Sequence, residues 1–187
     1  FMKILFSVLI IFLNSIFAID AKMEIIKQNQ SLPSISINIA SIDNKNLALE
    51  IKKILEQDLL ISGHFLTSNI NYNIDFDSEP NYTTLEKKSI DLFSNIILYK
   101  SGVSGIKLHL KLYDINSKKL ILNKIFNTSN KNKYPFLSHR VAISINKKFN
   151  APSIDWMDRF VLFSKYTASK KSEIIISDYT LTYQQVI

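Results

Sequence analysis

The feature that most constrains the fold is the segment Ile106–Asp114, in which apolar and polar side chains alternate. A period of two places successive side chains on opposite faces of a β-strand. Apolar segments at 96–99 and 120–126 flank it, and turn residues at 101–105 and 116–117 separate the three segments. We therefore predict an antiparallel meander of three strands, with one face on a core and the other in solvent.

Two more strands are predicted near the N-terminus. Segment Ser34–Ile39 alternates strictly between polar and apolar residues, and the shorter segment 23–27 alternates weakly. The strand at 23–27 has no obvious covering partner in the sequence. Because an uncovered strand edge can pair with a strand of another protein, this segment is a candidate for partner recognition.

A long helix is predicted between the strand at 34–39 and a polar, aromatic connection at 64–80. The side chains of Asp43 and Asn44 offer oxygens that can cap its N-terminus, and Gly63 suits a left-handed C-terminal cap. Its apolar residues recur at spacings of three and four and define one buried face. These residues are Leu47, Ile51, Ile54, Leu55 and Leu59.

Two other helices are expected. A short one at 83–90 would direct Leu85 and Ser89 inward, and the last one begins at Pro135, a residue that suits the first turn of a helix. The apolar face of this last helix repeats every four residues, through Leu137, Val141, Ile145 and Phe149. The element order predicts an α+β fold in which two to three helices cover a mixed β-sheet.

The first 21 residues have the pattern of a secretory signal peptide, with Lys3 followed by an apolar run and small residues at Ala18 and Ala21. The run is too short for a membrane-spanning helix, which needs roughly 20 apolar residues. The sequence contains no cysteine, so disulfides and thiol chemistry are excluded. We therefore expect a periplasmic protein that is not inserted in the membrane after signal cleavage, with an N-terminal domain at 22–150.

The formal charge of +7 raises the question of nucleic-acid binding. The lysines, however, are scattered as doublets along the chain, and Arg140 and Arg159 are the sole arginines. A nucleic-acid binder is expected to cluster its positive charge on one face or one helix. A solvated basic surface is therefore preferred, and no nucleic-acid partner is predicted.

No catalytic, cofactor-binding or metal-binding site is predicted. His64, His109 and His139 are far apart and lack neighbours at metal-ligand spacing, so they are expected on the surface. Asp75 and Asp77 are interpreted as a solvated turn, since no histidine or lysine beside them suggests acid–base chemistry. The function must therefore be inferred from architecture, compartment and resemblance.

The last helix ends at a predicted hinge, Asn150-Ala151-Pro152, and residues 151–187 then have a strand–turn–strand pattern. Phe149, Pro152 and Trp156 are the candidate interdomain residues. Trp156 is the sole tryptophan, and we interpret it as a plug between two domains rather than a ligand platform, because tryptophan buries a large area.

The residues around this hinge resemble those of the TolB family, the periplasmic component of the Tol-Pal cell-envelope system. The last N-domain helix, linker and entry strand of that family are similar to the segments 137–149 and 159–161. Ser177-Asp178-Tyr179 resembles the start of the family's Ser-Asp-x-Asp-Gly turn, although Thr180 and Leu181 replace the Asp-Gly.

The resemblance implies an α/β N-terminal domain followed by a six-bladed β-propeller, of which residues 151–187 would supply only the first strands, as in a truncated copy or gene fragment. It also implies a TolA-like inner-membrane partner, bound by the N-terminal segment and domain, and a Pal-like lipoprotein, bound by the propeller. The TolA-binding role falls on Met23, Glu24, Ile25, Ile26 and Lys27, while no residues here carry the Pal-binding role.

Three functions remain open on the sequence. The first is a non-enzymatic adaptor that links inner-membrane and outer-membrane partners for envelope integrity and constriction during cell division. The second is an exported, propeller-linked hydrolase or peptidase whose catalytic domain is missing. The third is an orphan periplasmic ligand-binding domain, which would have a deep apolar pocket with convergent polar groups.

Overall fold

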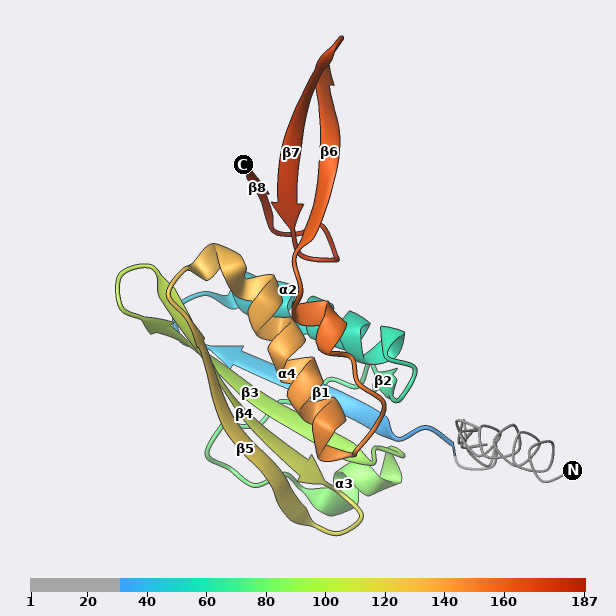
Figure 1. The fold of residues 1–187 in the computed structure, drawn as a ribbon. Helices are drawn as coiled ribbons and strands as arrows, with labels where there is room; N and C mark the ends of the chain where they lie inside the picture. The colour runs from blue at the N-terminus through green and yellow to red at the C-terminus, as the bar shows by residue number, and fades with distance from the viewer. Residues whose placement is uncertain (1–30) are drawn as a thin grey trace, which may run out of the picture. The chain divides into compact units, whose positions relative to one another are not determined.

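The computed structural model describes residues 31–187, and Figure 1 shows the arrangement of their helices and strands. Five strands form the first sheet: β1 (Ser34–Ser41), β2 (Leu66–Ser68), β3 (Leu92–Ser101), β4 (Gly105–Asp114) and β5 (Lys119–Thr128). Their order in the sheet is β2-β1-β3-β4-β5. Strand β1 pairs in parallel with β2 and β3, and β3, β4 and β5 form the predicted antiparallel meander.

Helices α2 (Lys45–Ile61) and α4 (Tyr134–Lys148) pack against one face of this sheet. The backbone N–H of Leu47 donates to Oδ1 of Asn44 at 3.0 Å, and Gly63 follows the helix with φ of +71°, as expected of these two caps. The predicted α+β fold with a mixed sheet is therefore confirmed. The core between helices and sheet includes Ile35, Ile51, Leu55, Ile96, Leu108, Leu110, Leu137 and Val141.

The opposite face of the sheet is not simply exposed to solvent, as the meander pattern suggested. Phe93 of β3 and Tyr113 of β4 form a second apolar cluster with Leu85 of the short helix α3 (Tyr82–Lys87). Ser89, which was expected to face inward, is exposed with φ of +56°, and Ile90 is buried instead. The helix ends before Ser89, so the helical spacing no longer applies there.

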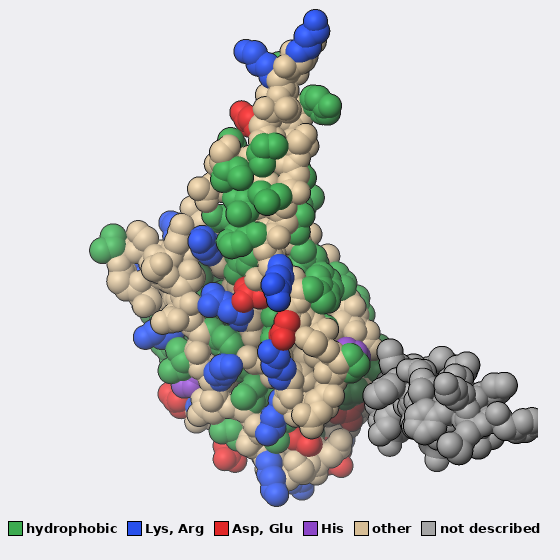
Figure 2. Space-filling model, viewed as in Figure 1, with side chains coloured by type: hydrophobic (Ala, Val, Ile, Leu, Met, Phe, Trp, Pro, Cys, Tyr) green, Lys and Arg blue, Asp and Glu red, His purple; other side chains and the backbone are tan. Residues whose placement is uncertain are grey.

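A second sheet follows the hinge and the short 3₁₀ segment η3 (Asp155–Asp158). It consists of β6 (Val161–Ala168), β7 (Lys171–Ser177) and β8 (Gln184–Val186), all antiparallel, in the order β6-β7-β8. This sheet fits the predicted start of a β-propeller. Figure 2 shows hydrophobic side chains along the β6–β7 hairpin, with Lys or Arg side chains at its tip and others dispersed over the rest of the viewed face.

Among residues 31–187, no helix has both the length and the hydropathy that a bilayer crossing requires. The predicted signal peptide, its cleavage site and the predicted strand at 23–27 lie outside the described residues.

Candidate functional site

The predicted interdomain residues lie at two different places. The Phe149 ring meets the Phe65 ring edge-on, with centroids 5.7 Å apart, inside the α+β domain. The Trp156 ring packs in the same manner against Tyr179, which follows β7, at 5.1 Å, and 49% of Trp156 remains exposed. Trp156 therefore contacts the turn between β7 and β8 of the second sheet, whereas Phe149 packs within the α+β domain.

The hinge is fixed from within helix α4. Nδ2 of the buried Asn146 donates to the carbonyl oxygen of Pro152 at 2.7 Å and, more weakly, to that of Ala151 at 3.4 Å. The Oδ1 atom of Asn146 in turn lies 2.7 Å from Nδ1 of His64. The Asn146 side chain thus binds the hinge carbonyls through its nitrogen and His64, in the connection after α2, through its oxygen.

A buried polar cluster joins the α+β domain to the turn that follows β7. His139 of α4 lies between two carboxylates, with Nδ1 2.8 Å from Oδ2 of Asp58 and Nε2 3.4 Å from Oδ2 of Asp178. The hydroxyl of Tyr179 donates to the other Asp58 oxygen at 2.5 Å. His139, Asp58 and Asp178 have no exposed surface. We call these four residues the junction cluster.

Asp178 also organises the turn in which it lies. It accepts hydrogen bonds from the backbone N–H of Tyr183 at 2.6 Å and of Thr180 at 2.8 Å, and from the Thr180 hydroxyl. Burial opposes the ionisation of Asp178, but the hydrogen bonds from His139, Thr180 and Tyr183 outweigh it and lower its pKa to about 2. Asp178 is therefore ionised across the neutral pH range.

The two carboxylates hold His139 in its charged form. Burial alone would lower the pKa of His139, but hydrogen bonds to Asp178 and Asp58, together with their charges, raise it to about 9. Burial and the hydrogen bond to Asp58 raise the pKa of Tyr179, which keeps its hydroxyl protonated as a donor. The imidazolium then donates to both carboxylates, and the two buried acids share its single positive charge.

The cluster is suited to holding chain segments together rather than to catalysis. Both nitrogens of His139 are engaged by carboxylates, and the ring is closed to solvent, so neither nitrogen can exchange a proton with a substrate. Within residues 31–187, no group of three or more His, Asp or Glu side chains has an arrangement that could hold a metal ion.

The expectation that all three histidines lie on the surface is wrong for His139. His64 and His109 are half-buried, and Nε2 of His109 lies 2.6 Å from Oδ1 of Asn123. A signal for the cluster is nonetheless present in the sequence. Asp58 follows Ile54 and Leu55 on the apolar face of its helix, where a charged residue requires a partner. Asp75 and Asp77 are exposed in a turn, as expected.

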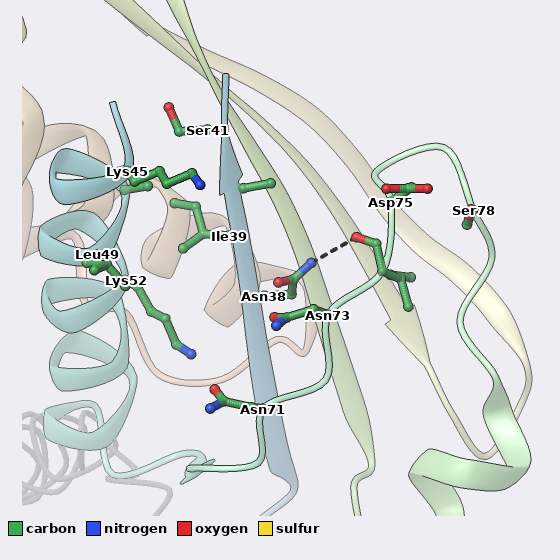
Figure 3. Close-up of a pocket in the computed structure, with 13 residues that line it drawn as sticks. Asn38, Ile39, Ser41, Lys45, Leu49, Lys52, Asn71, Asn73, Asp75 and Ser78 are labelled. Atoms are coloured by element: carbon green, nitrogen blue, oxygen red, sulfur yellow. Dashed lines mark hydrogen bonds between the residues drawn. The ribbon is translucent and has the colours of Figure 1, made fainter. Parts of the chain in front are cut away.

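A second candidate site is a groove of about 750 Å³ beside strand β1. Strand β1 forms its floor, and its two walls are helix α2 and the connection 71–78 (Figure 3). Lys45 and Lys52 extend from the helix toward the strand, while Asn71 and Asn73 lie on the opposite wall. The groove is open, and its lining mixes polar and apolar side chains, unlike the deep apolar pocket that a small-molecule-binding domain would require.

The family model of the TolB amino-terminal domain matches residues 21–121 of this sequence. Tol-Pal system protein TolB from Wolinella succinogenes is 40% identical over 177 residues, which cover 94% of this chain and 42% of that protein. The protein of the same name from Helicobacter hepaticus is 38% identical over 188 residues, which cover all of this chain and 44% of that protein. The chain thus spans less than half the length of these relatives.

One solved structure agrees at the level of the fold. The crystal structure of TolB from Acinetobacter baumannii superposes with a TM-score of 0.63 at 17% identity, covering 84% of this chain and 38% of that one. The match includes residues beyond the 21–121 range of the domain model, since it covers most of the chain. On the sequence match and the shared fold together, the chain belongs to the TolB family of Tol-Pal system proteins.

Proposed function

We propose that this chain is the N-terminal part of a non-enzymatic periplasmic adaptor. In the proposal, it links a TolA-like protein of the inner membrane to a Pal-like, peptidoglycan-associated lipoprotein. This linkage would support envelope integrity and constriction during cell division. The match to the Tol-Pal family over nearly the whole chain carries the proposal.

The proposed division of labour follows the domains. A signal peptide at 1–21 would direct export, and the domain at 22–150 would receive the TolA-like partner together with the segment Met23–Lys27. Residues 151–187 would form the hinge and the first strands of a propeller, whose remaining blades would bind the Pal-like protein. No cofactor is needed for such a role.

The junction cluster supports an adaptor rather than a hydrolase. Its charged groups are used to attach the turn after β7 to helices α2 and α4, and each has a protein partner. An adaptor that transmits force or position between two membranes benefits from domains joined by buried, directional contacts. In this proposal, Phe149, Pro152 and Trp156 are the interdomain residues at the hinge between the α+β domain and the propeller.

The test is a pull-down of the periplasmic domain of the cognate TolA-like protein. Replacing Met23–Lys27 with a Gly-Ser segment of equal length should abolish capture, because the segment would lose the side chains and strand propensity needed for pairing. Lys53→Gln, at an exposed position of α2 outside the groove beside β1, serves as a control and should be captured normally. Undiminished capture after replacement of Met23–Lys27 would contradict the role given to that segment.

A further inference from the structure

Strand β1 is paired on both sides along only part of its length. Strand β2 pairs with Ser34, Ile35 and Ser36, whereas β3 pairs with β1 from Ile35 to Ser41. In the part of the chain that the structure describes, no strand pairs with the β2 side of β1 beyond Ser36. This leaves an open strand edge at residues 37–41, and the edge forms the floor of the groove.

The direction of the backbone groups at this edge follows from two hydrogen bonds. The N–H of Asp91, just before β3, donates to the carbonyl of Ser34 at 3.0 Å, and the N–H of Leu66 in β2 donates to that of Pro33 at 3.0 Å. Backbone groups of a strand point alternately to its two neighbours. Even-numbered residues of β1 therefore face β3, and the N–H and C=O of Ile39 face the open edge.

The connection after β2, which could pair with this edge, is held against a face of the sheet instead. The hydroxyl of Ser36 donates to the carbonyl of Ile70 at 3.3 Å, and Nδ2 of Asn38 donates to that of Ile74 at 3.2 Å. Nδ2 of Asn95 in β3 also donates to the carbonyl of Asp75 at 3.3 Å. These side chains, buried beneath the connection, keep it beside the edge without pairing to it.

The groove has a preference for negative charge. Lys45 and Lys52 reach into it from α2, and among the described residues that line it Asp75 alone is acidic. Lys52 also lies 3.7 Å from Glu56, a loose contact for an ion pair. Leu49, which is 62% exposed, adds apolar surface between the two lysines. A strand bound in the groove would meet the backbone N–H and C=O groups of the β1 edge and the ammonium groups of Lys45 and Lys52.

We propose that this groove binds an extended, acidic peptide segment of a partner protein as an added β-strand beside residues 37–41. A strand rises about 3.3 Å per residue, so about five peptide residues would span this edge. Main-chain hydrogen bonds would supply affinity, and the alternation of side chains would place acidic groups on the lysine side. The sides of the groove come from residues 38–78, outside the segment Met23–Lys27 in the sequence, and the proposal does not depend on how that segment binds.

The probe is a fluorescent hexapeptide that alternates glutamate and valine. Its binding to the chain is followed by fluorescence polarisation and by amide hydrogen exchange in NMR spectra. We expect saturable binding, and exchange of the Ile39 amide should slow at least about tenfold, because its N–H gains an acceptor. Exchange of the neighbouring Ala40 amide, which faces β3, should not change. A hexapeptide that alternates lysine and valine should bind at least about tenfold more weakly.

Two variants separate the groove from general electrostatic attraction. Lys45→Gln/Lys52→Gln should raise the Kd about fivefold, since two exposed ion pairs are lost. Lys53→Gln, an exposed position on α2 outside the groove, should leave the Kd unchanged. The proposal is overturned if the acidic and basic peptides bind alike, or if neither binds at millimolar concentration. It is also overturned if the Ile39 amide is already protected in the free chain, because another segment would then occupy the edge.

Discussion

The two sheets of this chain differ in how completely their apolar side chains are buried. Both faces of the five-stranded sheet are packed, by α2 and α4 on one side and by the cluster around Phe93 on the other. The three-stranded sheet has large apolar side chains that remain exposed. These include Leu162 at 61%, Tyr166 at 82% and Ile174 at 46%.

The difference indicates where each sheet obtains its stability. Burial of apolar surface stabilises the first sheet through its own helices. The second sheet is buried mainly at the C-terminal end of β7, at Ile175 and Ser177, next to the buried Asp178. The junction cluster lies at that end. The second sheet is therefore stabilised there by hydrogen bonds and charge, whereas the first sheet is stabilised mainly by hydrophobic burial.

The largest expected effect tests this dependence directly. Asp58→Ala removes the partner of both His139 and the Tyr179 hydroxyl, and we expect it to lower the free energy of unfolding by about 3–5 kcal/mol. Urea unfolding followed by circular dichroism measures this loss. Emission of Trp156, whose ring lies 5.1 Å from that of Tyr179, reports separately on the junction.

Leu55→Ala is the matched control, one helical turn earlier on the same face of α2. It should cost about 2–5 kcal/mol through the cavity it creates, without a local change around Trp156 in the folded state. If Asp58→Ala costs less than about 1 kcal/mol and leaves Trp156 emission unchanged, the cluster does not hold the junction.

An intermediate effect is expected from pH. The pKa of His139 is raised from 6.5 to about 9 in the folded chain, so its contribution is complete below pH 6.5 and is lost as the pH rises through 9. The loss is about 3 kcal/mol. Asp178, with a pKa lowered from 3.8 to about 2, adds a second loss as the pH falls from 4 through 2.

Thermal or urea unfolding between pH 6 and pH 10 measures the alkaline loss. Leu55→Ala should give a parallel curve at lower stability, because it leaves the charges in place. His139→Gln should flatten the curve over the same range, since no group at that position would titrate. A wild-type curve that is flat from pH 6.5 to pH 10 would contradict the charged state assigned to His139.

The smallest expected effect compares one residue type in the two sheets. Leu162→Ala in β6 should change the free energy of unfolding by no more than about 0.5 kcal/mol, because the side chain is largely in solvent. Leu110→Ala in β4, where the leucine is completely buried, should cost about 2–5 kcal/mol. Equal losses in urea unfolding would show that β6 is packed as tightly as β4, which would remove the contrast between the sheets.

The periodicity of the sequence by itself determined most of the fold. Alternation identified β1 and the meander, and spacings of three and four identified α2 and α4, because side-chain direction repeats with the local backbone. The resemblance at 137–149 and 177–179 identified the TolB family. Strand β2 and the second cluster around Phe93 were missed, since both depend on packing across the sheet. The exposure of Ser89 was missed because helix α3 ends at Lys87.

Only the tertiary structure decided the two candidate sites. Asp58, His139 and Tyr179 meet across separations of up to 121 residues, and no local pattern specifies which buried acid will lie beside which histidine. The open edge of β1 likewise depends on where β2 stops and on where Asn38 holds the chain that follows. Local periodicity fixes which face of an element is buried, whereas the packing of distant elements fixes what that face meets.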